Sequence, residues 1–353
     1  MQKLLIDKNK IFTEDFNFIK KNHRAWGLLK NKKILLSGST GFIASSIIKF
    51  LITISKKKKL NLQIDCLLRN KKKGNDIYNQ FKLDKKNNLN LIKRNILNDI
   101  DLEGQYHYII HTASLASPSF FTKNPIETIL PNSLGVINML KFAERNKKLK
   151  KFIFFSTTGV NGFVDDALRP ISEETYGPIN HQELENTYLE SKRFGETACM
   201  SWFHQKKIPI NIIRPAITYG PGININDERS YSYFVKSIIN NKNIELSSDG
   251  SAIRNYCYIA DFINGFFFVF FKGKNGETYN VCSKREISIK KLTDTLCNKL
   301  FKHKKLKILF TKENFKRINF NRTTVSTKKL ENLGWKEGYT INEGFLRTVK
   351  SYE

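Results

Sequence analysis

The chain has 353 residues, of which 40% are hydrophobic, and its formal net charge is +28. This length predicts about two globular domains. No run approaches the ~20 apolar residues that cross a bilayer, which excludes a membrane-spanning helix. The five cysteines are scattered without a Cys-x-x-Cys pair, so we expect free thiols in the cytoplasm rather than a disulfide frame or a metal site.

The excess positive charge has two interpretations. A nucleic-acid or acidic-membrane partner would require basic residues grouped on one surface. The lysine-rich runs 56–59, 71–73 and 147–151 instead lie between predicted elements, and none is interleaved with aromatic side chains that stack on bases. We therefore expect neither a nucleic-acid nor a membrane partner, although the charge would help to attract an anionic small substrate.

Residues 1–30 contain apolar positions around Trp26 and are expected to form a helical extension. The segment 33–54 then predicts an apolar strand, a glycine turn and an amphipathic helix. In this context Gly38 permits the sharp turn, and Gly41 lets the backbone approach a pyrophosphate at the helix N-terminus. The alternative is a purely structural turn. The residues expected to bind a dinucleotide here are Gly38, Thr40, Gly41, Phe42 and Ile43.

The next strand, 62–68, ends at Arg69. An acidic residue at this strand end accepts the hydroxyls of the adenosine ribose, whereas an arginine can neutralise a 2′-phosphate. Arg69, followed by lysines at 71–73, therefore leaves NADP open beside NAD. Asp65 lies inside the strand and comes too early for the ribose.

Further apolar strands follow within 88–97, 106–114, 150–162 and 210–222. Because they alternate with helical stretches, they predict an α/β fold with a parallel, doubly wound Rossmann sheet. We expect this domain to span 31–213. A smaller α/β domain for the substrate would span 214–353, with some strand exchange back into the first sheet and a helix capped by Asp261. Loops at the carboxyl ends of the strands should line the cofactor crevice, contributing Asn95, Ile96, Thr112, Ala113, Ser114, Ser156 and Pro215.

In the segment 186–196, Tyr188 precedes Lys192 by four residues among good helix formers. One helical turn apart, the two side chains would share a face. A phenol with a pKa of ~10 is a poor base at neutral pH, but an adjacent ammonium group would lower that pKa. Taken alone, the spacing arises often by chance, and an ordinary solvated helix surface is then the favoured interpretation.

Six motifs occur in a fixed order: GSTGFIA, HTASLASP, STTGVNG, YLESK, RPAITYGPG and RNYCYIADF. Over about residues 33–350 they resemble the extended short-chain dehydrogenase/reductase family of NAD(P)-dependent nucleotide-sugar epimerases, dehydratases, decarboxylases and reductases. HTASLASPSFF and GININDERSYSYFVKSII are most similar to its UDP-glucuronate decarboxylase branch. The resemblance implies a nucleotide-diphosphate sugar as substrate, NAD as cofactor, no metal, and a homodimer built on the helix that carries Tyr188.

The resemblance also implies roles for individual residues. Tyr188 would be the catalytic base, and Lys192 would lower its pKa and contact the nicotinamide ribose. The Thr157 hydroxyl would hold the sugar hydroxyl, and Ser156 would lie beside the nicotinamide. Arg229 and Arg254 belong to the implied substrate set, because guanidinium groups suit a diphosphate. The alternative for each is an ordinary surface salt bridge. The implied substrate contacts are Ala116, Ser117, Thr157, Arg229 and Arg254.

Three positions depart from the motifs that the chain resembles. Decarboxylases of this branch carry a glutamate where this chain has Gly159, a tyrosine where it has Asn161, and an arginine where it has Gly222. Dehydratases need an acid pair after the catalytic threonine, which Thr158 and Gly159 do not supply. We therefore favour an epimerase or C4 oxidoreductase that oxidises a sugar hydroxyl to a 4-ketone. The alternatives are a UDP-glucuronate decarboxylase-like enzyme and a non-enzymatic cofactor-binding protein.

Overall fold

The computed structural model describes residues 2–82, 88–310 and 323–353. Its largest feature is a seven-stranded sheet with strand order β10-β6-β5-β4-β1-β2-β3, in which every neighbouring pair is parallel. The order reverses at β1, so the predicted doubly wound Rossmann sheet is confirmed. The strands are β1 (Lys33–Ser37), β2 (Gln63–Leu68), β3 (Leu89–Lys93), β4 (Tyr108–His111), β5 (Lys151–Phe155), β6 (Ile210–Pro215) and β10 (Glu277–Val281).

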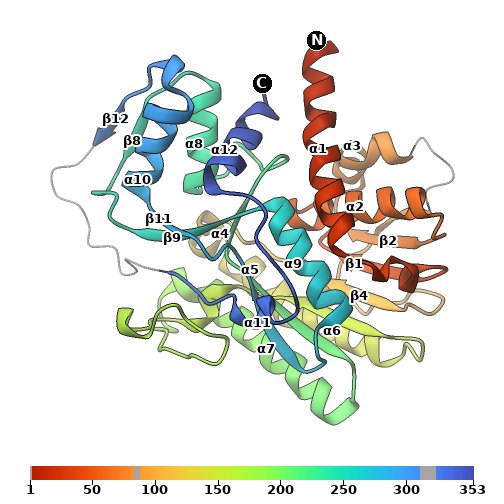
Figure 1. Ribbon diagram of the computed structural model, residues 1–353. Helices are drawn as coiled ribbons and strands as arrows, with labels where there is room; N and C mark the ends of the chain where they lie inside the picture. Colours follow the sequence, from red (N-terminus) through yellow and green to blue (C-terminus); the bar gives the residue numbers. More distant parts are fainter. Residues whose placement is uncertain (1, 83–87, 311–322) are drawn as a thin grey trace.

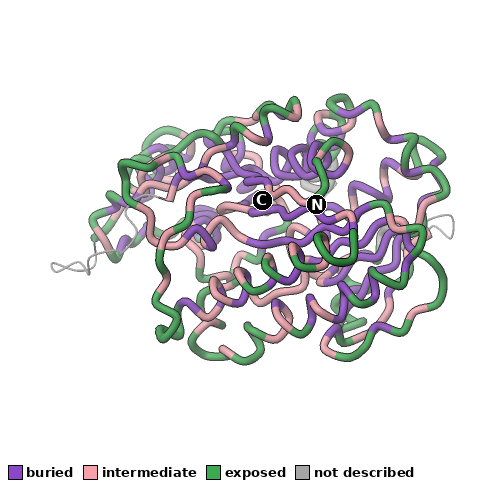
Figure 2. Tube along the Cα trace, turned by 90° about the horizontal axis from the view of Figure 1, so that it is seen from below, coloured by how far each residue is buried: buried purple, intermediate pink, exposed green. Residues whose placement is uncertain are grey.

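Helices cover both faces of this sheet, and alternate strand residues belong to two different cores. Leu35 and Phe154 pack with apolar side chains of α6 and α7, whereas Leu36 and Phe155 pack with those of α2 and α9. Figure 2 shows the buried trace, in purple, concentrated in this interior. Strands buried on both faces read as continuous apolar runs. The helices are α2 (Phe42–Lys58), α3 (Lys71–Lys82), α4 (Pro118–Lys123), α5 (Pro125–Asn132), α6 (Leu134–Glu144), α7 (Thr187–Lys206) and α9 (Ile259–Lys272).

The remaining C-terminal elements form a smaller half, to the left of the large sheet in Figure 1. It contains a three-stranded sheet of order β11-β9-β7 and a two-stranded sheet of β12 and β8. Strand β10 leaves this half to pair with β6 of the large sheet. The elements are β7 (Ile217–Tyr219), α8 (Ser230–Ile239), β8 (Ile244–Leu246), β9 (Ile253–Tyr258), β11 (Glu286–Ser288), α10 (Ile289–Asp294), β12 (Ile308–Phe310), α11 (Lys328–Glu331) and α12 (Ile341–Lys350).

Helix α1 (Gln2–Asn22) packs against α9 at the centre of the molecule (Figure 1). Phe16, Ile19 and Trp26 are buried there. Arg347 of α12 pairs with Asp15 of α1 at 2.7 Å, which ties the first helix to the last. Within the described residues, no helix is long and apolar enough to cross a membrane.

The prediction that Asp261 caps a helix is wrong. Tyr258 occupies the cap position of α9, and Asp261 lies in the first turn of the helix. Its two carboxylate oxygens accept hydrogen bonds from the backbone N–H groups of Gly338 and Tyr339, at 2.7 and 3.0 Å. Asp261 therefore fastens the loop before α12 to α9 instead of closing a helix end.

Candidate active site

The turn between β1 and α2 brings two predicted cofactor segments into contact. Gly38 has a φ of 71°, and a Cβ added to it would lie 2.6 Å from the backbone N and Cα of Ala113. Only glycine permits so close an approach. Thr112 fixes the same junction because its hydroxyl donates to the Ser37 carbonyl at 2.6 Å. The other residues predicted here, Thr40, Gly41, Phe42 and Ile43, lie in the turn or the first turn of α2, where helix N–H groups favour an anion.

The carboxyl end of β2 is positively charged. Arg69 is exposed there, and the exposed lysines 71–73 begin α3. Asp65 is not free to meet a ribose, because its buried carboxylate accepts from the Tyr106 hydroxyl at 2.6 Å and pairs with Lys33 at 3.0 Å. Arg69, unlike Asp65, therefore faces solvent at this strand end.

The loop after β3 packs beside α6. Ile96 is buried, and its carbonyl oxygen accepts from the Asn138 side chain at 3.0 Å. A Cβ on Gly135 would lie 2.8 Å from the Cδ1 atom of Ile96, so the glycine makes room for this side chain. Asn95 is exposed at the same strand end.

Thr157, Tyr188 and Lys192 meet at the carboxyl end of β5. Tyr188 and Lys192 are both buried on α7, and the Lys192 Nζ lies 5.8 Å from the centre of the Tyr188 ring. This Nζ donates a hydrogen bond of 2.6 Å to the Phe155 carbonyl, the last of β5. Thr157 follows two residues later and hydrogen-bonds Tyr188. The solvated-surface alternative for the Tyr188–Lys192 pair is therefore wrong.

The expectation that Lys192 lowers the pKa of Tyr188 is wrong for the protein without a cofactor. Burial raises the pKa of Tyr188 to about 12, against lowering effects of Arg229 and of the Thr157 hydrogen bond. Burial also lowers the pKa of Lys192 to about 7. Desolvation disfavours both charged forms, so at pH 7 the phenol is neutral and the amine keeps only about half of its charge.

The predicted substrate residues lie around Tyr188 and in the smaller half. Arg229 precedes α8 and acts on the pKa of Tyr188, but its guanidinium is also paired with Asp227, at 2.8 Å. Arg254 lies on β9, half-buried, and donates to the Ile253 carbonyl at 2.8 Å. Ala116 and Ser117 lead into α4, and Pro215 ends β6 beside β5.

Two predicted cofactor residues carry buried hydroxyls without a partner among the described residues, namely Ser114 and Ser156. Buried polar groups are rarely left unpaired, so these oxygens mark places where a polar ligand would bind. With the glycine turn pressed against Ala113, they form a cradle that fits NAD. Bound NAD would supply an acceptor and donor of hydride.

Sequence reasoning missed two apolar side chains at this site. The Phe121 ring of α4 stacks on the Tyr188 ring with centroids 4.8 Å apart and an interplanar angle of 2°. Leu189, next to Tyr188, lies against Gly159. A Cβ added to Gly159 would lie 2.6 Å from the Cδ2 atom of Leu189. In the sequence, Phe121 follows the motif HTASLASP and Leu189 lies within YLESK. Nothing else marks them, and apolar residues at such positions are ordinarily assigned to a core.

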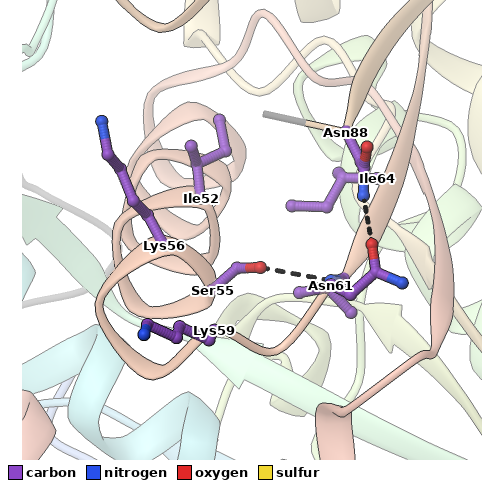
Figure 3. A pocket seen from close by; sticks show the side chains of 8 residues that line it. Ile52, Ser55, Lys56, Lys59, Asn61, Ile64 and Asn88 are labelled. Carbon is purple, nitrogen blue, oxygen red and sulfur yellow. Dashed lines mark hydrogen bonds between the residues drawn. The ribbon is translucent and has the colours of Figure 1, made fainter. Parts of the chain in front are cut away.

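A separate hollow lies at the opposite end of the sheet, between the end of α2 and the start of β2 (Figure 3). Asn88 donates to the Asn61 side chain at 2.9 Å across it, and the Ser55 hydroxyl accepts from the Leu62 backbone at 3.2 Å. None of the predicted site residues lines it. Open α/β sheets bind ligands at the carboxyl ends of their strands, so this hollow is not the candidate site.

Fold and site define a dinucleotide-binding protein of the Rossmann class. The chain belongs to the NAD dependent epimerase/dehydratase family, whose model matches residues 34–282.

Curated relatives and solved structures fall within the same group. The chain is 28% identical over 323 residues to UDP-glucuronic acid decarboxylase 5 of Arabidopsis thaliana, covering 89% of this chain and 87% of the relative. It is similar in fold to UDP-glucose 4-epimerase of Thermotoga maritima, with a TM-score of 0.75, 20% identity and coverage of 91% and 98%. For UDP-glucuronic acid 4-epimerase of Bacillus cereus the TM-score is 0.74, with 21% identity and coverage of 90% and 98%.

Replacing Lys192 tests its burial. The pKa of Lys192 falls from 10.5 to about 7 in the folded chain. As pH drops through this window, the unfolded chain binds a proton that the folded chain does not, so the wild type loses stability. Lys192→Met escapes this loss. Relative to wild type, its free energy of unfolding should therefore be higher at pH 7 than at pH 10 by about 3.5 kcal/mol, since each pKa unit corresponds to about 1.36 kcal/mol.

Urea unfolding at several pH values measures this difference. The exposed Lys58→Met on α2 is the matched control and should run parallel to wild type. If Lys192→Met also runs parallel, the lysine keeps its ordinary pKa inside the fold.

Proposed function

We propose that the protein is an NAD(P)-dependent nucleotide-sugar epimerase or C4 oxidoreductase. The observation that carries the proposal is the meeting of Thr157, Tyr188 and Lys192 at the carboxyl end of β5. Two strands away in the same sheet, Gly38 holds the dinucleotide turn against Ala113. Both sets of residues lie at the carboxyl edge of the sheet, which supports a proton acceptor and a cofactor cradle that act together.

In the proposed reaction, the sugar C4 hydroxyl gives its proton to the Tyr188 phenolate as C4 is oxidised. NAD(P), held by the Gly38 turn and the Ser114 and Ser156 hydroxyls, would supply the hydride acceptor. The Thr157 hydroxyl holds the sugar oxygen as it becomes a carbonyl. Lys192 and Arg229 provide positive charge that favours the phenolate. Return of the proton from Tyr188 restores the alcohol, and the epimer would form if the sugar ring turned before C4 was reduced on its other face.

UDP-glucuronate decarboxylation is the second candidate. The curated relatives named UDP-glucuronic acid decarboxylase support it, and a 4-keto uronate loses CO₂ readily. Against it stand Gly159 and Gly222, where motifs of that branch carry a glutamate and an arginine. A third possibility, a cofactor-binding protein without turnover, does not explain why Thr157 and Lys192 are both grouped around Tyr188.

A panel of UDP-, GDP-, CDP- and dTDP-sugars with NAD or NADP tests the reaction. We expect one sugar to be isomerised without a change of mass, or to lose two hydrogens, as followed by mass spectrometry and NMR. Tyr188→Phe should lower kcat by a factor of ~10² or more, since it removes the proton acceptor, and should leave cofactor affinity within about twofold. A variant with near-normal kcat would show that Tyr188 is not the base, and loss of CO₂ from a uronate would favour the second candidate.

We propose further that the cofactor site accepts NADP as well as NAD. The exposed Arg69 and the lysines after it support this, because a guanidinium can pair with a 2′-phosphate. Arg69→Asp should weaken NADP binding about tenfold or more while NAD binding changes little. Titration of bound reduced cofactor by fluorescence measures both. Lys59→Asp is the control, because it alters the net charge by the same amount at the opposite end of the sheet. If the two variants lost equal NADP affinity, the loss would come from the change in net charge and not from a contact of Arg69 with the 2′-phosphate.

A homodimer is also proposed, packed through α5 and α7. These helices contact each other and expose Ile126, Ile129 and Phe194, with 65%, 41% and 45% of their surface accessible. Apolar side chains grouped in this way suit an interface. Phe194→Glu should shift the protein toward monomer in sedimentation velocity. Leu28→Glu, at an exposed leucine of the 3-10 helix Ala25–Leu29, should leave the mass unchanged. A wild type that sediments as a monomer contradicts the proposal.

A further inference from the structure

Leu189 occupies the space beside the catalytic threonine that a side chain at position 159 would otherwise enter. A Cβ built on Gly159 would lie 2.6 Å from the Cδ2 atom of Leu189 and 3.7 Å from the Oγ1 atom of Thr157. A side chain at 159 would therefore begin in contact with the Thr157 hydroxyl and would require Leu189 to shift. The backbone of Gly159 is not in the left-handed region, so a larger residue would be allowed there if Leu189 moved aside.

Leu189 lines the site rather than filling a core. It is half-buried and belongs to none of the hydrophobic clusters formed by the described residues. Phe121 covers the Tyr188 ring face, so two apolar groups flank the catalytic residues. The groups that act on the pKa of Tyr188 are Arg229 and Thr157, and neither can accept a proton from carbon.

The apolar side chains around Tyr188 and Thr157 limit the chemistry that can follow oxidation of the sugar at C4. A ketone acidifies the C–H bonds on its neighbouring carbons, but removing such a proton requires a base within about 3 Å of it. Position 159 is close enough to Thr157 for a carboxylate there to serve. In this chain it has no side chain, and Leu189 takes up the room.

We propose that Leu189, seated against Gly159, is a specificity-determining residue that confines the reaction to the oxidised carbon. This inference rests on the proposed function. The hydroxyl proton passes to Tyr188 as C4 is oxidised and returns only when C4 is reduced again, and the bound cofactor would take up and supply the hydride. The hydrogens on C3 and C5 are retained, so the substrates are nucleotide sugars that change at C4 alone. Decarboxylation and dehydration would each place a solvent proton on a carbon of the sugar.

Turnover in D₂O tests this directly. The product made by the wild type should carry no deuterium on C3 or C5 in its NMR spectrum. Deuterium on either carbon, with or without loss of CO₂, would overturn the inference while leaving hydride transfer at C4 intact. In the double variant Gly159→Glu, Leu189→Ala, deuterium should enter at least tenfold faster than in wild type. The control Leu184→Ala, at an exposed leucine shortly before α7, should behave as wild type.

A stability measurement tests the contact without any turnover. Gly159→Ala places a methyl group against Leu189 and should lower Tm by about 2 °C. In a Leu189→Ala background the same change should leave Tm unchanged or raise it, since alanine restricts the unfolded chain more than glycine. Equal losses in both backgrounds would overturn the inference, because Leu189 would then not fill the space. If the Gly159→Ala effect on Tm depends on Leu189 as expected but no sugar reacts, the result counts against the proposed function alone.

Discussion

The site depends on one buried cation. Lys192 leaves only 2% of its surface exposed, and its ammonium group lies at the carboxyl end of β5, where it donates to the Phe155 carbonyl and lies 4.9 Å from the centre of the Phe154 ring. These contacts offset only part of the cost of removing it from water, which is why its pKa falls to about 7. The same cation helps burial to lower the pKa of His111 to about 3. A bound ligand with acceptors for this ammonium would restore its charge. Under the proposed function, cofactor binding would then favour the Tyr188 phenolate through Lys192.

Much of the fold follows from local sequence patterns. The strand, glycine turn and helix of 33–54 are predicted correctly because a strand buried on both faces is a continuous apolar run and because Gly38 marks the turn. The run FINGFFFVFF is different, because a fully buried segment has no polar face and therefore no hydrophobic periodicity that separates helix from strand. Its packing in the folded chain shows that it belongs to helix α9. Pairing of β10 with β6 joins residues more than sixty positions apart, and no local pattern fixes its register.

The candidate site was predictable to the extent that a motif fixes geometry. Helical spacing places Tyr188 beside Lys192, and strand ends place Ser156 and Ser114 along the same edge. The direction of the Tyr188 pKa was not predictable, because burial belongs to the assembled structure and outweighs the neighbouring charge that the spacing implies. The stacking of Phe121 was missed for the same reason, since its partner lies 67 positions away on another helix.

Two of the three departures from the family motifs, Gly159 and Asn161, lie in the loop after β5. Asn161, which replaces a tyrosine, uses its side-chain amide to donate to the Ser172 and Thr175 carbonyls at 3.2 and 2.6 Å, and its own carbonyl accepts from Gly177. A position that could face a substrate thus fastens the segment 172–177. Gly159, two residues earlier, leaves its space to Leu189. At neither position does the loop after β5 carry an acidic or phenolic side chain beside Thr157, so under the proposed function this loop adds no proton-transfer group of its own.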